Sequence, residues 1–188
     1  MSFKYKNGNL LNSGCEYICH QVNCLGVMGA GIAKQIKEKW PIVYNEYQEK
    51  YRETNYEILK NYGGFENSPS TSEVLLGDIQ LVKVEEDTTV INMFSQEYYG
   101  NDGRRYTSYD AFWICLNKIK QQVPKGSIIG FPMNIGCGLG GANWEVISTM
   151  ISEVLGKDYS VLIYCYPSFM KQYNCISNNN DSDWDFCK

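Results

Sequence analysis

Apolar and polar positions alternate with two different periods along most of this chain, and the pattern predicts a succession of strands and helices. Short runs rich in β-forming residues predict strands at 4–9, 15–22, 75–84, 88–94, 127–131 and 160–166. Apolar positions at helical spacing predict helices at 32–40, at 43–61, after Ser108 and at 144–155. Strands that alternate with helices in this way indicate a layered α/β domain with a central, mixed or parallel sheet.

The length of 188 residues predicts a single domain, because domains typically contain about 100–200 residues. We assign this domain to residues 1–170. Residues 171–188 are rich in asparagine and aspartate and cannot bury much surface. We therefore predict that 171–188 form a polar, acidic tail that is disordered.

The charge balance limits the classes of partner. The chain has 17 Lys and Arg residues, 21 Asp and Glu residues and a formal net charge of -4, so we expect no stable nucleic-acid binding by charge. Recognition of one modified nucleotide in a pocket would not need such charge. No run has the 18 or more apolar residues of a membrane span, and the N-terminus lacks the apolar stretch of a signal peptide. We expect a cytoplasmic monomer that does not bind membranes.

The eight cysteines include no C-x-x-C pair, and several lie in apolar runs, where cysteine behaves as a small hydrophobe. A reducing compartment fits this placement best. A zinc site at Cys15, Cys19, His20 and Cys24 is the alternative, but this spacing matches no common zinc module. We therefore expect no metal and no other cofactor.

Two glycine-rich stretches follow predicted strands and lead into predicted helices. They are residues 26–31, GVMGAG, and residues 134–141, NIGCGLGG. Open α/β sheets bind ligands at such strand ends, and the N–H groups of glycines and of a helix N-terminus favour phosphate. Neither stretch is a Walker motif, and neither fits the G-x-G-x-x-G dinucleotide pattern cleanly. Either one alone is compatible with a simple tight turn, whereas the pair suits a pyrophosphate.

Residues 20–33, HQVNCLGVMGAGIA, resemble the first ligand loop of macrodomains, in the branch that contains ADP-ribose-1''-phosphate phosphatases, terminal ADP-ribose glycohydrolases and DNA ADP-ribosyl glycohydrolases. Residues 135–145, IGCGLGGANWE, resemble the second, phosphate-binding loop of that branch. Between them, 92–96 and 104–109 are similar to stretches of small bacterial and phage members. The resemblance spans residues 3–167 and implies a three-layer α/β/α macrodomain with a central mixed sheet.

The resemblance also implies a crevice that binds ADP-ribose. The diphosphate would lie between the loops, on Gly29, Ala30, Gly31 and Ile32 of the first and on Ile135, Gly136, Cys137, Gly138, Leu139, Gly140 and Gly141 of the second. Asn23 would lie beside the distal ribose, and the adenine end would lie near Asn9, Leu10 and Tyr166. Many macrodomains have an aspartate where this chain has Asn9, whose amide oxygen can still accept a hydrogen bond. The Gly-Asp-Ile sequence at 77–79 has the same letters as that motif, and we interpret it as unrelated to the site.

The resemblance points to His20 for catalysis. Related glycohydrolases with a catalytic lysine carry it just after the strand that corresponds to 90–94. This chain has FSQE at 94–97 and therefore no lysine there. The aspartate of their second loop is also missing, because Gly140 stands in its place. Phosphatase members resemble this chain in having a histidine at the start of the first loop. Its ordinary pKa near 6.5 suits a general base or a proton shuttle. A structural histidine at a strand end is the alternative.

We therefore predict a phosphatase that converts ADP-ribose-1''-phosphate to ADP-ribose and phosphate, with ADP-ribose or ADP-ribose-1''-phosphate as its small-molecule ligand. One alternative is an ADP-ribosyl hydrolase that removes ADP-ribose from protein or nucleic acid. The other is a non-catalytic module that binds or sequesters ADP-ribose-type nucleotides. All three would use the same crevice.

The polar loop 95–107 offers further candidates. Its tyrosines can cover the distal ribose or pack the loop, its arginines can contact a terminal phosphate or be solvated, and its aspartate can orient water or belong to a turn. These residues are Tyr98, Tyr99, Asp102, Arg104, Arg105 and Tyr106.

Overall fold

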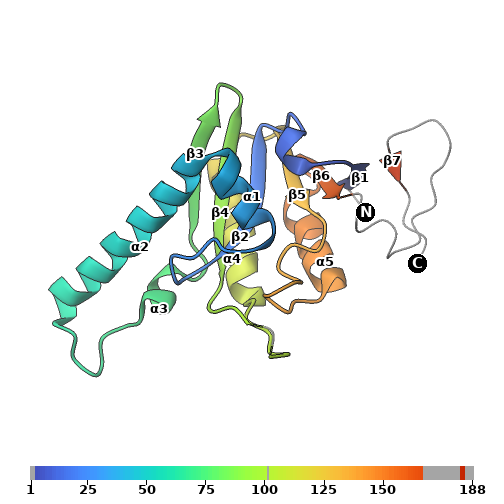
Figure 1. Ribbon diagram of the computed structural model, residues 1–188. Helices are drawn as coiled ribbons and strands as arrows, with labels where there is room; N and C mark the ends of the chain where they lie inside the picture. The colour runs from blue at the N-terminus through green and yellow to red at the C-terminus, as the bar shows by residue number, and fades with distance from the viewer. Residues whose placement is uncertain (1–2, 101, 167–182, 185–188) are drawn as a thin grey trace.

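Seven strands form one mixed sheet in the computed structural model, which describes residues 3–100, 102–166 and 183–184 (Figure 1). The strands are β1 (Phe3–Asn7), β2 (Tyr17–Asn23), β3 (Ile79–Glu85), β4 (Thr88–Gln96), β5 (Ile128–Pro132), β6 (Ser160–Cys165) and β7 (Asp183–Trp184). Their order across the sheet is β3-β4-β2-β5-β6-β1-β7. The five strands from β4 to β1 are parallel, whereas β3 and β7 run antiparallel at the two edges. The predicted central mixed sheet is confirmed.

Helices pack on both faces of this sheet, so the predicted three-layer arrangement is confirmed. One face carries α1 (Gly31–Lys39), α2 (Pro41–Tyr62), the short α3 (Thr71–Leu75) and the 3-10 helix η1 (Leu10–Asn12). The other face carries α4 (Tyr109–Gln122) and α5 (Trp144–Leu155). Along β2, Ile18 and Val22 pack in the core beneath α1 and α2, and Cys19 packs in the core beneath α4 and α5. Both faces of β2 are therefore buried, as expected of a central parallel strand.

The predicted elements agree with the observed ones to within a few residues over most of the chain. Pro41 separates α1 from α2, and it also begins α2, since proline fits the first helical turn, where its missing N–H costs no hydrogen bond. The Ser108 hydroxyl accepts a hydrogen bond from Ala111 N and caps α4, as predicted. The predicted helix at 144–155 coincides with α5.

The predicted strand at 75–84 is wrong at its start. Ser70 and Glu73 form a capping box that begins α3, and this helix ends at Leu75. A turn follows, and β3 begins only at Ile79. Leu75 is therefore a buried residue of a helix and not of a strand. A short apolar run in the sequence does not distinguish the two.

Most of the predicted tail at 171–188, together with the domain boundary at 170, lies outside the described residues. The structure does describe β7, which pairs antiparallel with β1 through Tyr5 opposite Trp184 and Lys6 opposite Asp183. Among the helices in the described ranges, none is long and apolar enough to cross a bilayer.

Candidate functional site

Three loops meet at one edge of the sheet because they follow parallel, neighbouring strands. β4, β2 and β5 lie side by side, and they lead into loops that begin at residues 97, 24 and 133. All three loops lie at the lower end of the sheet in Figure 1. We refer to them as the β4 loop, the first loop and the second loop. The two glycine-rich stretches are thus brought to the same edge, at the strand ends where open α/β sheets bind ligands.

Asn23, at the end of β2, holds the first loop in shape. Its Oδ1 accepts a hydrogen bond from Leu25 N at 2.9 Å, and its Nδ2 donates to Val27 O at 2.7 Å. The Tyr47 hydroxyl of α2 lies 2.8 Å from Asn23 Oδ1 and accepts from Val27 N at 3.0 Å. Asn23 is buried, so its side chain supports the loop. Its place beside the distal ribose stays a prediction.

The exposed part of the first loop leads directly into α1. Gly29, Ala30 and Gly31 are exposed, and Ile32 is half-buried. Gly31 begins α1 with a φ of 56°, which glycine adopts without steric cost. Within the described part of the chain, no side chain caps α1. The N–H groups of its first turn therefore need an acceptor from water or from a ligand such as a phosphate.

Tight turns shape the second loop. Gly136 and Gly141 have φ angles of 76° and 67°, and Gly136 O accepts a hydrogen bond from Ala142 N at 3.0 Å. Ile135 is buried in the core that α4 and α5 cover, and it anchors the loop, whereas Gly138 is exposed. The half-buried positions of this loop include Cys137 and Leu139. The loop thus combines a buried anchor with exposed backbone.

A buried polar network ties the second loop to the β4 loop. Gln21 of β2 donates from Nε2 to Gln96 Oε1 at 2.8 Å and to Thr107 Oγ1 at 2.9 Å. Thr107 in turn donates from Oγ1 to Gly136 O at 3.0 Å and from N to Gly140 O at 2.9 Å. A Cβ atom at Gly140 would overlap Thr107 Oγ1 and would lie 2.5 Å from Gly136 O. Packing therefore requires glycine at position 140.

His20 lies in the interior, on the face of β2 that α1 and α2 cover. It is 0% exposed, and its Nε2 lies 2.5 Å from Asn92 Oδ1. Its buried Nδ1 has no hydrogen-bond partner among the described residues. Burial lowers the pKa of His20 to about 4, although the bond to Asn92 acts in the opposite direction. These contacts favour the structural alternative, and catalysis by His20 stays a prediction.

The residues predicted for the adenine end come just after two parallel neighbouring strands. Asn9 follows β1 and Tyr166 follows β6, so the structure brings them to the same edge of the sheet. Asn9 Oδ1 accepts a hydrogen bond from Leu11 N at 2.9 Å and caps η1. Leu10 is buried in the core, while Tyr166 is 48% exposed. The adenine contacts themselves stay predictions.

Asp78 has a structural role, in agreement with the interpretation of residues 77–79 as unrelated to the site. Its carboxylate lies 2.6 Å from Lys50 Nζ of α2 and 2.7 Å from Lys118 Nζ of α4. Burial alone would raise the pKa of Asp78, but the hydrogen bonds from Lys118 and Lys50 outweigh it and lower the pKa. The two ion pairs thus link helices from opposite layers.

Neither loop cysteine is an activated thiol. Burial raises the pKa of Cys24 to about 12 and that of Cys137 to about 11, so both thiols stay protonated near neutral pH. Within residues 3–100, 102–166 and 183–184, no group of three His, Cys, Asp or Glu side chains is placed to hold a metal ion. The alternative of a zinc site near the first loop therefore has no support in that part of the chain.

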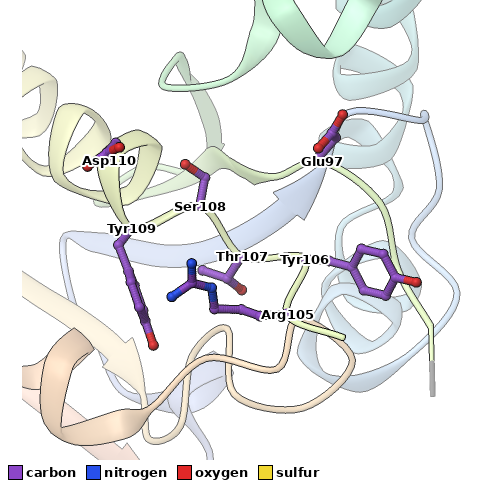
Figure 2. A pocket seen from close by; sticks show the side chains of 7 residues that line it. All are labelled: Glu97, Arg105, Tyr106, Thr107, Ser108, Tyr109 and Asp110. Atoms are coloured by element: carbon purple, nitrogen blue, oxygen red, sulfur yellow. The ribbon is translucent and has the colours of Figure 1, made fainter. Parts of the chain in front are cut away.

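A shallow hollow of about 330 Å³ lies beside the β4 loop (Figure 2). Its lining includes Glu97 and Arg105, whose guanidinium carbon lies 4.3 Å from the centre of the Tyr109 ring. Glu97 is exposed and directly follows Gln96, the residue opposite Asn23 in the sheet. Figure 2 shows Glu97 close to the end of β2. Glu97 thus lies at the edge where the first loop begins, and its carboxylate accepts a hydrogen bond from the Ser72 hydroxyl of α3 at 3.5 Å.

The sequence pattern assigns no role to Gln21 or Glu97. The signal for Gln21 is a polar residue inside an otherwise buried strand, which needs a buried partner. The signal for Glu97 is only its place after β4, and its nearness to the first loop depends on the strand order. The role of Gln21 could have been inferred from the sequence, whereas the position of Glu97 required the fold.

No family model matches this chain. The DNA ADP-ribosyl transferase-DNA ADP-ribosyl glycohydrolase fusion protein of Thermosipho africanus is 24% identical over 160 residues, and the DNA ADP-ribosyl glycohydrolase of Mycobacterium tuberculosis is 25% identical over 165 residues. These matches cover 84% and 85% of this chain, but 40% and 41% of the relatives. The chain therefore spans about two fifths of the length of these curated relatives.

Solved structures share the fold at similarly low identity. A protein of unknown function from Bacteroides thetaiotaomicron has a TM-score of 0.68 at 27% identity, covering 87% of this chain and 98% of that one. The macrodomain of Mycobacterium tuberculosis DarG has a TM-score of 0.63 at 23% identity, covering 86% and 96%. Thermosipho africanus DarTG in complex with ADP-ribose has a TM-score of 0.61 at 22% identity, covering 87% and 41%. Each likeness extends over most of this chain.

Proposed function

We propose that this chain, which has the macrodomain fold, binds ADP-ribose between its two glycine loops and hydrolyses the bond that joins the distal ribose to a nucleic acid. The observation that carries this proposal is the position of the loops. The first follows β2 and the second follows β5, its parallel neighbour, so both present backbone at the same edge of the sheet. Glycine backbone and the start of α1 suit the two phosphates of ADP-ribose.

The relatives support this class of substrate. The curated relatives are DNA ADP-ribosyl glycohydrolases by name, and DarTG of Thermosipho africanus has been solved with ADP-ribose. Because the likeness covers more than four fifths of this chain, we expect the same ligand in its crevice. We expect a hydrolase that acts on the bond at C1'' of the distal ribose.

Glu97 is the general base that we propose for this reaction. Water attacks C1'' of the distal ribose, Glu97 takes a proton from that water, and the bond from C1'' to the acceptor breaks. The acceptor keeps the electron pair and gains a proton from solvent, which leaves free ADP-ribose. An exposed carboxylate beside the first loop suits this role. The two loops would contribute by holding the ribose and the diphosphate in place.

Phosphate release from ADP-ribose-1''-phosphate is the second candidate, and the histidine at the start of the first loop is the observation in its favour. His20 is 0% exposed and its pKa is lowered to about 4 by burial, so it is poorly suited to activate water from this position. A phosphatase in this crevice would have to use another base, and Glu97 is available to both reactions.

The test uses the full chain with three substrates: a single-stranded oligonucleotide with ADP-ribose on one base, a mono-ADP-ribosylated protein, and ADP-ribose-1''-phosphate. Released ADP-ribose and phosphate are measured, and calorimetry gives the affinity for free ADP-ribose. We expect ADP-ribose to be bound and to be released from the oligonucleotide. Phosphate release alone would replace this proposal with the phosphatase, and binding without turnover would replace it with a binding module. A chain that does not bind ADP-ribose would overturn all three.

A further inference from the structure

Three tyrosines form an aromatic cluster in the β4 loop, and two of them are exposed. The rings of Tyr98 and Tyr99 are stacked, with centroids 5.5 Å apart and planes 9° apart, and the Tyr106 ring lies 5.6 Å from that of Tyr98. Tyr98 and Tyr99 are 52% and 38% exposed. The Tyr106 hydroxyl donates to Asp102 Oδ2 at 2.8 Å, which fixes the third ring. Aromatic surface that is held in place and yet exposed suits a planar ligand.

This tyrosine cluster is bonded to the second loop and follows β4, the strand that lies beside β2. Tyr106 N donates to Gly140 O of the second loop at 2.9 Å. On the other side, Gln96 lies opposite Asn23 in the sheet, and its Nε2 donates to Tyr98 O at 2.5 Å. The cluster is therefore next to the place proposed for the distal ribose, and next to any group attached to that ribose.

An arginine adds positive charge beside the rings. The Arg104 side chain is 79% exposed, and its Nε lies 3.4 Å from Asp102 Oδ2. An exposed ion pair of this kind contributes little, so Arg104 can exchange it for a phosphate. The formal net charge of the whole chain is -4, which disfavours contacts with a long run of phosphates. The tyrosine rings and Arg104 together therefore suit one or two nucleotides.

We propose that Tyr98 and Tyr99 stack on a base of the single-stranded nucleic acid that carries the ADP-ribosyl group, with Arg104 on a neighbouring phosphate. This inference rests on the proposed function, because it assigns the acceptor side of the same site. Every base has a flat face that stacks on tyrosine, whereas a peptide acceptor rarely offers one. The cluster therefore selects nucleic acid over protein as the acceptor, without contacting ADP-ribose itself.

The experiment measures dissociation constants by rapid-mixing fluorescence, before any turnover. The ligands are free ADP-ribose, a single-stranded oligonucleotide with ADP-ribose on one base, and a peptide with ADP-ribose on one side chain. The double variant Tyr98→Ala/Tyr99→Ala is compared with Tyr98→Phe/Tyr99→Phe, which keeps both rings. Tyr56→Ala is the matched control, because Tyr56 is a 63% exposed tyrosine on α2, away from the β4 loop.

We expect the alanine variant to weaken binding of the oligonucleotide by about five-fold to 100-fold, and to leave ADP-ribose and the peptide unaffected. The phenylalanine variant should restore binding, and Tyr56→Ala should not change it. Unchanged oligonucleotide binding, or an equal loss for the peptide or for free ADP-ribose, would overturn the inference. If the wild-type chain does not bind free ADP-ribose, the proposed function itself is wrong. The measurement with free ADP-ribose therefore distinguishes failure of the proposed function from failure of this inference.

Discussion

His20 of β2 and Asn92 of β4 form a buried hydrogen bond between neighbouring strands, with His20 Nε2 2.5 Å from Asn92 Oδ1 and neither side chain exposed. Asn92 Nδ2 donates onward to Gln80 Oε1 at 3.0 Å, and Gln80 Nε2 donates to Glu46 O of α2 at 2.9 Å. Since a carboxamide oxygen only accepts, this assignment puts the imidazole hydrogen on Nε2. The chain of bonds joins three strands to a helix, which gives His20 a structural role.

We expect His20 to make stability depend on pH between 5 and 6.5. The chain has a single histidine, and burial lowers its pKa from 6.5 to about 4. Below pH 6.5 the unfolded chain takes up a proton that the folded chain does not. The free energy of unfolding therefore falls as the pH decreases, by about 1.5 kcal/mol from pH 6.5 to 5. Denaturant unfolding at intervals across this range measures the slope.

The control for this prediction is His20→Gln, because glutamine can still donate to Asn92 but does not titrate. The slope should disappear in this variant, and an unchanged slope would assign it to another group. Turnover by the folded variant is a separate readout. Complete loss of turnover in this variant would favour His20 as the catalytic base, as the sequence predicts.

The layers and the loops could be predicted because each depends on local pattern. Periodic apolar positions locate the strands and helices, and glycines locate the turns with positive φ, as at Gly136. The environment of His20 could not be predicted in the same way. His20 and Gln21 point to opposite faces of β2, and both faces are buried, so alternation does not reveal which one reaches the crevice. The position of Glu97 depends on the strand order, which a single sequence does not determine.

Gly140→Ala should disrupt the second loop. The added Cβ would overlap Thr107 Oγ1 and lie 2.5 Å from Gly136 O, and such overpacking typically costs about 1–3 kcal/mol. We expect a lower melting temperature and weaker binding of ADP-ribose by calorimetry. For the melting temperature, Gly138→Ala is the matched control, since no atom of the described residues lies within 4 Å of its added Cβ. Equal effects of the two substitutions would remove the packing argument.

Gly31→Glu should abolish ADP-ribose binding while the fold persists. Gly31 has open space around its Cβ position and begins α1, so the substitution adds a carboxylate where we propose that the diphosphate binds. Its φ of 56° adds a strain of about 1–2 kcal/mol. Gly126→Glu has similar strain, with a φ of 87°, and similar open space, but it precedes β5 at the opposite edge of the sheet. Calorimetry should therefore separate the two variants, and equal affinities would remove the first loop from the site.

Glu97→Gln should slow release of ADP-ribose from an ADP-ribosylated oligonucleotide while affinity for free ADP-ribose is retained. Glutamine keeps the size of the side chain but cannot take a proton from water, and loss of a general base typically costs about 10²–10⁴-fold in rate. Asp110→Asn is the matched control, because Asp110 is an exposed carboxylate that lines the same hollow (Figure 2) but lies at the start of α4. The rate constants from single-turnover assays, in which every conjugate is bound, compare the chemical step directly. Equal rates for Glu97→Gln and wild type would exclude Glu97 as the base, and an equal loss in Asp110→Asn would point to the charge of the hollow as a whole.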